Sequence, residues 1–441
     1  MKHINIKHNL LFSIVFFGFS IVQAQEVITS EKAVKLALEN NYGIKVANNN
    51  IQIAENNSNL LNTDYLPTLT GNAGAVYNLD NIDAEFSNGT STELNGATSS
   101  GYNASLNLNY TLFDGFGRKY DYQNLQEQYQ LSELQARETI ENTVIQLFSI
   151  YYNVARVKEN SLSLNEVLAV SKDRLSRANY QFEYGQNSKL NILNAQVDIN
   201  NDSINLINSN QQLTSAKRDL NVVLGNTLSS EFEVDTSITF VLNEEKASLL
   251  EKTKSRNIAL LLAEKNIILN ELNIKSNQST YLPTVGLTGS YGWNRNNNNE
   301  ASFLSVASNN GLSGGLSLTW NLFNGRNITN VNNAKINLET ERLQKESTLI
   351  SLERDFNNAW DDYQNKLNIY LLQKDNIITS QNNFDRTKEQ FDIGQVNSTE
   401  FRQAQLNLLN AKLSTNAAKY EAKFAELQLL QLSGELLNVP F

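Results

Sequence analysis

The chain contains two copies of one sequence unit, and this duplication restricts the possible folds more than any other feature. Three short motifs recur in the same order: Tyr-Leu-Pro-Thr at 65–68 and 281–284, Leu-Phe-(Asp/Asn)-Gly at 112–115 and 322–325, and Arg-x-x-x-Gln-Phe-x-x-Gly-Gln at 177–186 and 386–395. The shifts between partners are 216, 210 and 209 residues, so they change only by small differences in loop length. A repeat this long predicts two related structural units rather than unrelated domains.

Each copy contains two segments in which apolar and polar residues alternate. These segments are 68–79, 102–112, 284–294 and 312–322. Alternation predicts strands, and a Leu/Tyr face opposite a Ser/Thr/Asn face suits lipid on one side and water on the other. The edge of a soluble sandwich shows the same period. The segments have about the ~9–11 residues that a tilted membrane strand needs. Tyr102, Tyr110, Trp293 and Trp320 near their ends resemble an interfacial girdle. The Asn-, Ser- and Gly-rich links 80–100 and 295–310 are expected to be surface loops.

Helical periodicity fills the remainder of both copies. Helices are expected over 30–63 and 251–279, stopped by the X-Pro steps, and over roughly 116–181 and 326–390. The last two would reach about 100 Å at ~1.5 Å per residue. Apolar residues from Phe401 to Leu432 alternate in steps of three and four, which predicts a coiled-coil seam. Segment 227–250 joins the copies and is expected to add a short strand.

The N-terminus has the features of a secretory signal peptide. Lys2 and Lys7 precede the apolar stretch 10–22, which ends at Val22-Gln23-Ala24. The mature chain should begin at Gln25; an uncleaved anchor is the alternative. No later run approaches 18 apolar residues, so a membrane location would have to rest on strands. The predicted organisation is a signal peptide (1–24), a first repeat (25–230), a connecting equatorial segment (231–250) and a second repeat (251–441).

The composition excludes most enzymes. The chain has no cysteine, and its two histidines, His3 and His8, lie in the predicted signal peptide. The mature chain would therefore lack Ser-His-Asp and Cys-His sites and the usual zinc ligands. It has no phosphate-binding glycine motif. We expect no catalytic residue, cofactor or metal, and the formal net charge of −10 argues against nucleic acid.

These motifs resemble those of the TolC-like outer-membrane factor family over essentially the whole mature chain. The resemblance rests on Ala37-Leu38-Glu39-Asn40-Asn41, both Tyr-Leu-Pro-Thr strand starts, both Leu-Phe-(Asp/Asn)-Gly strand ends and both (Tyr/Ile)-Gly-Gln turns. Tyr42 stands where the family usually has proline. The N-terminal cysteine at which some relatives are lipidated is missing.

The resemblance implies a membrane α+β fold built from a duplicated strand-hairpin and long-helix unit. Each chain would supply four strands to a trimeric 12-stranded β-barrel, continued by a coiled-coil α-helical barrel. Three chains give an even number of strands above the ~8 of the smallest barrels. The location implied is the outer membrane of a Gram-negative bacterium, in contact with its lipid, with the helices in the periplasm.

The function implied is that of a passive exit duct in a tripartite efflux or type I secretion system. Its partners would be two further copies of the chain, a periplasmic adaptor and an inner-membrane pump of RND or ABC type. The alternative is a trimeric surface adhesin or a structural coiled-coil protein. The duplication favours the duct, because an adhesin stalk has no need for two matched membrane hairpins.

Two groups of candidate site residues follow from the family pattern. Gly185, Gln186, Gly394 and Gln395 match the family's adaptor-docking tips, although a glycine also fits any helix-hairpin turn. Glu400 matches an acidic ring at the tunnel's narrow end. Gln403 and Asn191 stand at related aperture positions, with Arg402 as a partner nearby. Three Glu400 carboxylates within a Debye length of ~8–10 Å would favour cations. The alternative for Glu400 is a solvated first-turn carboxylate stabilised by the helix dipole.

Overall fold

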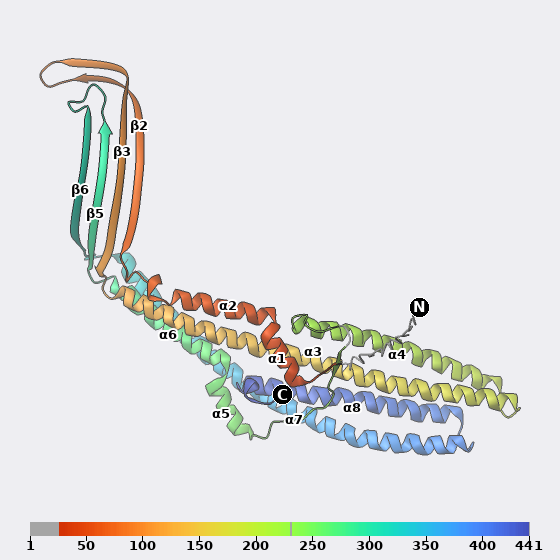
Figure 1. Ribbon diagram of the computed structural model, residues 1–441. Coiled ribbons are helices and arrows are strands. Elements are labelled where there is room, and N and C mark those ends of the chain that lie inside the picture. The colour runs from red at the N-terminus through yellow and green to blue at the C-terminus, as the bar shows by residue number, and fades with distance from the viewer. Residues whose placement is uncertain (1–25, 230–231, 441) are drawn as a thin grey trace, which may run out of the picture.

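The computed structural model describes residues 26–229 and 232–440 of the chain. The protein is elongated, with a four-stranded sheet at one end and long helices extending away from it at an angle (Figure 1). The predicted signal peptide 1–24 and the predicted mature start at Gln25 lie outside the described residues.

The sheet is antiparallel and has the order β2-β3-β5-β6. Its strands are β2 (Thr68–Glu85), β3 (Ser91–Phe113), β5 (Thr284–Asn297) and β6 (Val306–Thr319). Leu106 lies opposite Tyr291, and Tyr291 lies opposite Leu312, so the apolar positions share one face. On the other face the Ser290 hydroxyl donates to Asn107 Oδ1 at 2.8 Å. The predicted two-faced strands therefore combine in register into a two-faced sheet.

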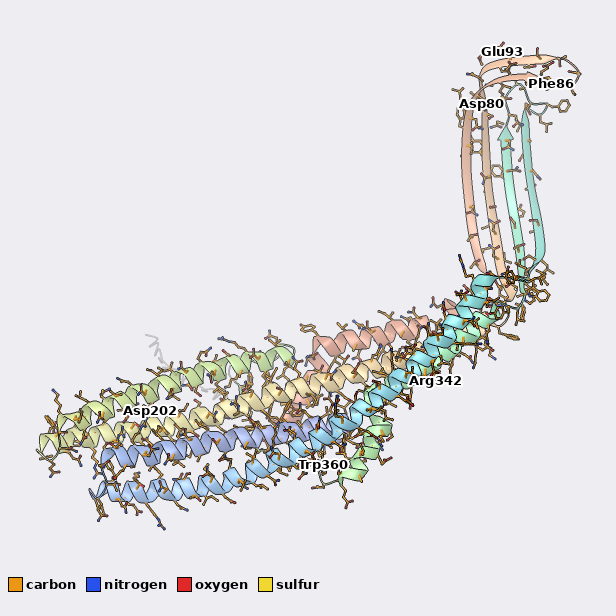
Figure 2. All side chains as sticks on the ribbon, turned by 180° about the vertical axis from the view of Figure 1, so that it is seen from behind. Asp80, Phe86, Glu93, Asp202, Arg342 and Trp360 are labelled. Atoms are coloured by element: carbon orange, nitrogen blue, oxygen red, sulfur yellow. The ribbon has the colours of Figure 1, made fainter. Side chains whose placement is uncertain are left out.

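The first hairpin is longer than expected, because most of the link 80–100 is strand rather than loop. β2 and β3 stay paired as far as Glu85 and Ser91, and a register shift between Asp80 and Ile82 marks a bulge. Figure 2 shows the outer part of the hairpin, which carries Asp80, Phe86 and Glu93, bent over at the far end of the sheet. The second link is also shorter than expected, since only 298–305 separates β5 from β6. Polar composition suggested loops here, but strands pair through backbone N–H and C=O groups, which polar residues supply as well as apolar ones.

The helical part consists of two long antiparallel hairpins. Its helices are α1 (Ser30–Asn40), α2 (Tyr42–Asn57), α3 (Gly117–Glu183), α4 (Lys189–Val223), α5 (Lys246–Arg256), α6 (Ile258–Ser279), α7 (Gly325–Asp392) and α8 (Ser398–Leu432). The long helices α3 and α7 have 67 and 68 residues, which confirms the predicted lengths. α3 packs on α4 and α7 packs on α8, while α3 also contacts α8. No helix within the described ranges has the length and hydropathy of a membrane span.

The expected helices 30–63 and 251–279 are each broken near their start by an asparagine. Asn41 separates α1 from α2 and accepts hydrogen bonds from the next backbone N–H groups, while Asn257 separates α5 from α6 in the same way. Each side-chain amide also donates at 2.9 Å to a carbonyl at the end of a long hairpin, Asn41 to Val223 and Asn257 to Leu432. A side chain that caps a helix favours non-helical backbone at its own position, which explains both breaks.

The core lies midway along the molecule, where the first and last described residues and the connecting segment meet the helices (Figure 1). The short strands β1 (Glu26–Ile28) and β4 (Phe232–Val234) pair in parallel, and β4 is the strand expected in the connecting segment. Tyr151 of α3 donates to the Ile28 carbonyl at 2.8 Å. The buried Glu426 of α8 accepts from the backbone N–H groups of Val241 and Leu242 at 2.6 and 2.7 Å. We call the end of each helical hairpin that lies away from its turn, where α4 or α8 stops, the root of that hairpin. These contacts fix the connecting segment close to both roots.

Candidate functional site

The two turns predicted as docking tips have the same geometry. Gly185 and Gly394 follow α3 and α7 with φ of +70° and +78°. The next residue's N–H returns to the helix in both, from Gln186 to the Gln181 carbonyl and from Gln395 to the Gln390 carbonyl, each at 2.8 Å. This is a Schellman turn, which glycine favours because it adopts positive φ without steric cost.

The tips are also open to solvent. A Cβ atom built on Gly185 or Gly394 would meet nothing within 4 Å. Gln186 and Gln395 are exposed, and in the described part of the chain their side chains have no hydrogen-bond partner. The tips lie at the opposite end of the molecule from the sheet (Figure 1). Both glutamine side chains are therefore available to another protein.

Glu400 takes part in a capping box at the start of α8. Its backbone N–H donates to Asn397 Oδ1 at 2.9 Å, and its carboxylate accepts from the Asn397 N–H at 3.1 Å. Gln403 donates to Asn407 at 2.8 Å, and Asn191 donates to Asn187 in the first hairpin. Glu400 thus lies in the first turn of α8 with its carboxylate exposed at the tip, and its place at the aperture stays a prediction.

Arg402 has a partner other than the expected Glu400. Its Nη1 and Nη2 atoms lie 2.9 and 2.7 Å from the two carboxylate oxygens of Asp202 on α4. The hydroxyl of Ser171 on α3 donates to the same carboxylate at 2.6 Å. Residues two apart on a helix do not face each other, so Arg402 points away from Glu400 and joins α8 to the first hairpin.

Further charged residues that the sequence reasoning missed surround this pair. Arg174, which is almost fully buried, binds Asp198, and Arg177 binds Asp392. A signal was present in α4, where Ala195, Asp202, Ser209 and Ala216 recur every seven residues and are buried. A carboxylate in a coiled-coil seam of small residues predicts a buried partner.

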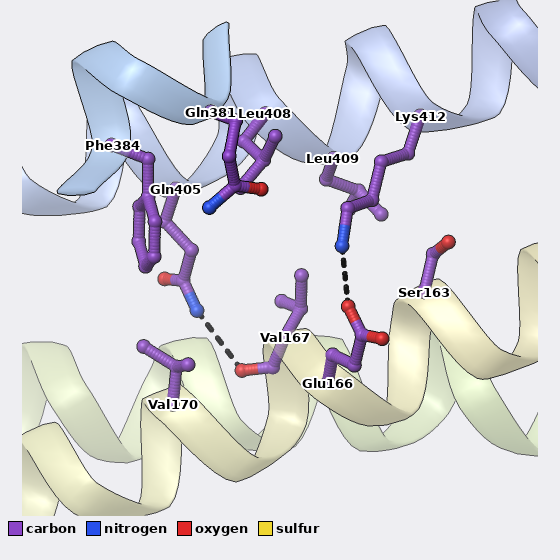
Figure 3. A pocket seen from close by; sticks show the side chains of 10 residues that line it. All are labelled: Ser163, Glu166, Val167, Val170, Gln381, Phe384, Gln405, Leu408, Leu409 and Lys412. Atoms are coloured by element: carbon purple, nitrogen blue, oxygen red, sulfur yellow. Dashed lines mark hydrogen bonds and ion pairs between the residues drawn. The ribbon is translucent and has the colours of Figure 1, made fainter. Parts of the chain in front are cut away.

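A line of polar contacts continues along the α3–α8 junction. Gln405 donates to the Val167 carbonyl at 2.9 Å, Lys412 binds Glu166, and Asn416 donates to Asn160 at 3.0 Å. Figure 3 shows the first two contacts on either side of a small cavity between the hairpins. The cavity holds about 120 Å³, and half of the residues that line it are apolar, including Phe384 and Leu408. The two hairpins of one chain are therefore joined by polar pairs toward the tips, and also by apolar contacts such as the stacked rings of Tyr152 on α3 and Tyr420 on α8.

The ionisable groups of the described residues give no sign of a metal centre. Between 26 and 229 and between 232 and 440, no three or more His, Cys, Asp or Glu residues gather as ligands. Glu141, in the interior of α3, is 1% exposed and bound to Arg137 at 2.8 Å. Burial raises its pKa, against the opposing effect of Arg137. The absence of catalytic residues and cofactors stays a prediction.

Sequence comparison identifies the family. The profile of the outer membrane efflux protein family matches residues 33–226 and 249–435, one segment in each copy. The chain belongs to this family. It is an outer-membrane efflux protein whose long helices lie in the periplasm, as the sequence motifs indicated.

Individual relatives of this efflux protein agree with the assignment. It is 22% identical over 311 residues to the outer membrane protein TolC of Vibrio cholerae, covering 68% of this chain and 69% of that one. It is 18% identical to the outer membrane efflux protein BepC of Brucella suis, covering 92% and 85%. The crystal structure of the Campylobacter jejuni CmeC outer membrane channel has the same fold, with a TM-score of 0.75 at 17% identity, covering 92% and 86%. None of these three relatives supports the adhesin alternative.

Proposed function

We propose that three copies of this chain form a passive duct from the periplasm to the exterior. The observation that carries the proposal is the incomplete sheet: β2 and β6 are edge strands, each paired on one side only. Four strands cannot close a barrel, whereas three chains supply twelve. Edges of this length are normally covered by another strand. Each 14-residue strand of the second hairpin reaches about 46 Å at ~3.3 Å per residue, more than the ~30 Å hydrocarbon core.

The helical part supports the same assembly. α4 carries an exposed apolar stripe with heptad-like spacing, made of Leu190, Leu193, Val197, Ile204 and Ile207. α7 also exposes apolar side chains, among them Ile369, Leu372 and Ile378. Exposed stripes of this kind mark an interaction surface. In a ring of three chains, α7 of one copy would face α4 of the next.

Native mass spectrometry of the detergent-solubilised protein tests this assembly. We expect a trimer. A monomer found under mild conditions, with strand content retained in circular dichroism spectra, would contradict the proposal.

The tips are proposed to dock a periplasmic adaptor, through which the duct meets an inner-membrane pump. The support is the pair of exposed turns at the end away from the sheet, with Gln186 and Gln395 unpartnered in the described chain. Replacing both glutamines with arginine should abolish dye extrusion by cells that carry only this variant, with trimer yield unchanged. The exposed Gln52 of α2 gives the control, since Gln52→Arg should leave extrusion intact. Normal extrusion in the tip variant would refute the docking role.

Glu400, Gln403 and Asn191 are proposed to border the periplasmic aperture. The three Glu400 carboxylates of a trimer would then attract cations at the entrance.

A further inference from the structure

The tips of the two hairpins within one chain are joined by an arginine. Arg177, close to the end of α3, donates to both the carboxylate and the backbone carbonyl of Asp392, the last residue of α7. Its guanidinium also lies over the ring of Phe391, 4.9 Å from the centroid. We call these three residues the tip clasp.

The repeat contains a second set of the same residues. At the shift of 209 that relates the two turns, Arg386 corresponds to Arg177, Phe182 to Phe391 and Glu183 to Asp392. All three are exposed. Within the described ranges, Arg386 and Glu183 make no ion pair or side-chain hydrogen bond. The second set therefore has every component of a clasp but is not assembled within one chain.

The repeat also shows which surfaces would bring the second set together. Inside the chain, the first hairpin presents α3 to the α8 side of the second hairpin. The corresponding surfaces that remain are the α7 side of the second hairpin and the α4 side of the first. α4 and α8 both have 35 residues and both follow a Schellman turn, so the two hairpins match in length from root to tip. A junction between copies can then repeat the junction within the chain.

We propose that Arg386 of one copy binds Glu183 of the adjacent copy, with its guanidinium over the ring of Phe182. The partner is thus a second copy of this chain, and the inference rests on the trimer proposed above. Six hairpin tips would form a closed ring in which clasps within a chain alternate with clasps between chains.

A second position supports the same junction. Within the chain, Asn416 of α8 donates to Asn160 of α3 at 3.0 Å. At the shift of 209 these residues correspond to Ile207 of α4 and Ile369 of α7, both apolar and exposed. A hydrogen-bonded pair within the chain is thus replaced by two isoleucines that would bury each other between copies. The replacement is coordinated on both sides, as a real contact requires.

Cysteine cross-linking tests the proposal, because the chain has no cysteine of its own. The test variant is Arg386→Cys with Glu183→Cys, treated in native membranes with a flexible bismaleimide reagent and analysed on denaturing gels. We expect covalent dimers and trimers. The matched control is Arg177→Cys with Asp392→Cys, which should cross-link within one chain and stay a monomer on the gel.

The outcomes separate this inference from the proposed function. An intact trimer by native mass spectrometry without cross-links between chains would overturn the second clasp and leave the trimer standing. A monomer would overturn both. Charge exchange gives an independent reading: Arg386→Glu should lower the temperature at which the trimer dissociates, and adding Glu183→Arg should restore it. Glu183→Arg should not rescue Arg177→Glu, whose partner is Asp392, and a rescue there would also contradict the assignment.

Discussion

Arg402 joins the two hairpins of one chain at a buried carboxylate, so Arg402→Ala probes how firmly the tip is held. Asp202 has a side chain 3% exposed, and Arg402 is 13% exposed. Without the guanidinium, the Asp202 carboxylate would keep only the Ser171 hydroxyl among the described residues. The substitution therefore leaves a buried charge without its counter-ion.

The degree of burial sets the size of the effect. Removing one partner of a buried ion pair costs about 3–5 kcal/mol, because the other charge stays desolvated. At 1.36 kcal/mol per factor of ten, local opening of the tip should become roughly a hundredfold to a few thousandfold more frequent. Lys412→Ala is the matched control, since its partner Glu166 is 64% exposed. An exposed pair of this kind contributes about 0–1 kcal/mol.

Amide hydrogen exchange of the intact protein measures this difference. Protection in the tip halves of α4 and α8 should fall strongly in Arg402→Ala and little in Lys412→Ala. The double variant Arg402→Met with Asp202→Leu should recover most of the protection, because it removes both charges and retains apolar volume. Equal exchange in Arg402→Ala and Lys412→Ala would refute the reasoning.

Three further predictions concern single positions. Gly434→Ala should lower the unfolding temperature more than Gly185→Ala. Both glycines have φ near +70°, which costs about 1–2 kcal/mol for alanine. Of the two added Cβ atoms, only the one at position 434 would lie 2.5 Å from a backbone oxygen. Equal losses would contradict this. Burial raises the pKa of Glu141, so the folded state holds its proton more tightly, and stability should fall as pH rises from the usual carboxyl pKa to the raised value. In Glu141→Gln the unfolding free energy should change less with pH, as measured by urea titrations at mildly acidic and neutral pH. An unchanged pH dependence would refute the role given to Glu141. Glu400→Lys should shift the reversal potential of single channels in a salt gradient toward anions. Glu400→Gln, which can keep the capping box, should shift it less, and no shift in either variant would exclude Glu400 from the pore.

Long periodic segments were predictable because their patterns repeat many times. The alternating segments and the 67- and 68-residue helices each contain enough residues to separate a period of two from one of 3.6. The extension of the first hairpin was not predictable from composition. Ile82 opposite Leu94 continues the strand pattern through an otherwise polar tract, but two such residues are too few to outweigh the Asn and Ser around them.

For contacts between helices far apart in the sequence, the type of partner could be predicted but not its identity. Asp202 at a heptad position predicts a buried partner, but the sequence does not indicate that this partner is Arg402, 200 residues away. The choice depends on how α8 is rotated against α3 and α4, which is set by packing along their whole length. The turn positions of Gln186 and Gln395 and the first-turn position of Glu400 could be predicted from the motifs alone, because a helix end is determined by residues close together in the sequence.

The asparagine anchors at Asn41 and Asn257 have a consequence for how the protein can change in evolution. Each anchor fixes the root of one hairpin, and from that root α4 and α8 both extend 35 residues, about 52 Å. An insertion of seven residues into each arm of one hairpin would preserve its seam but move its tip about 10 Å beyond the other. Length changes at this end should therefore be tolerated only when both copies acquire them. At the sheet end no such matching applies. The strands of the first β-hairpin have 18 and 23 residues, whereas those of the second have 14 and 14.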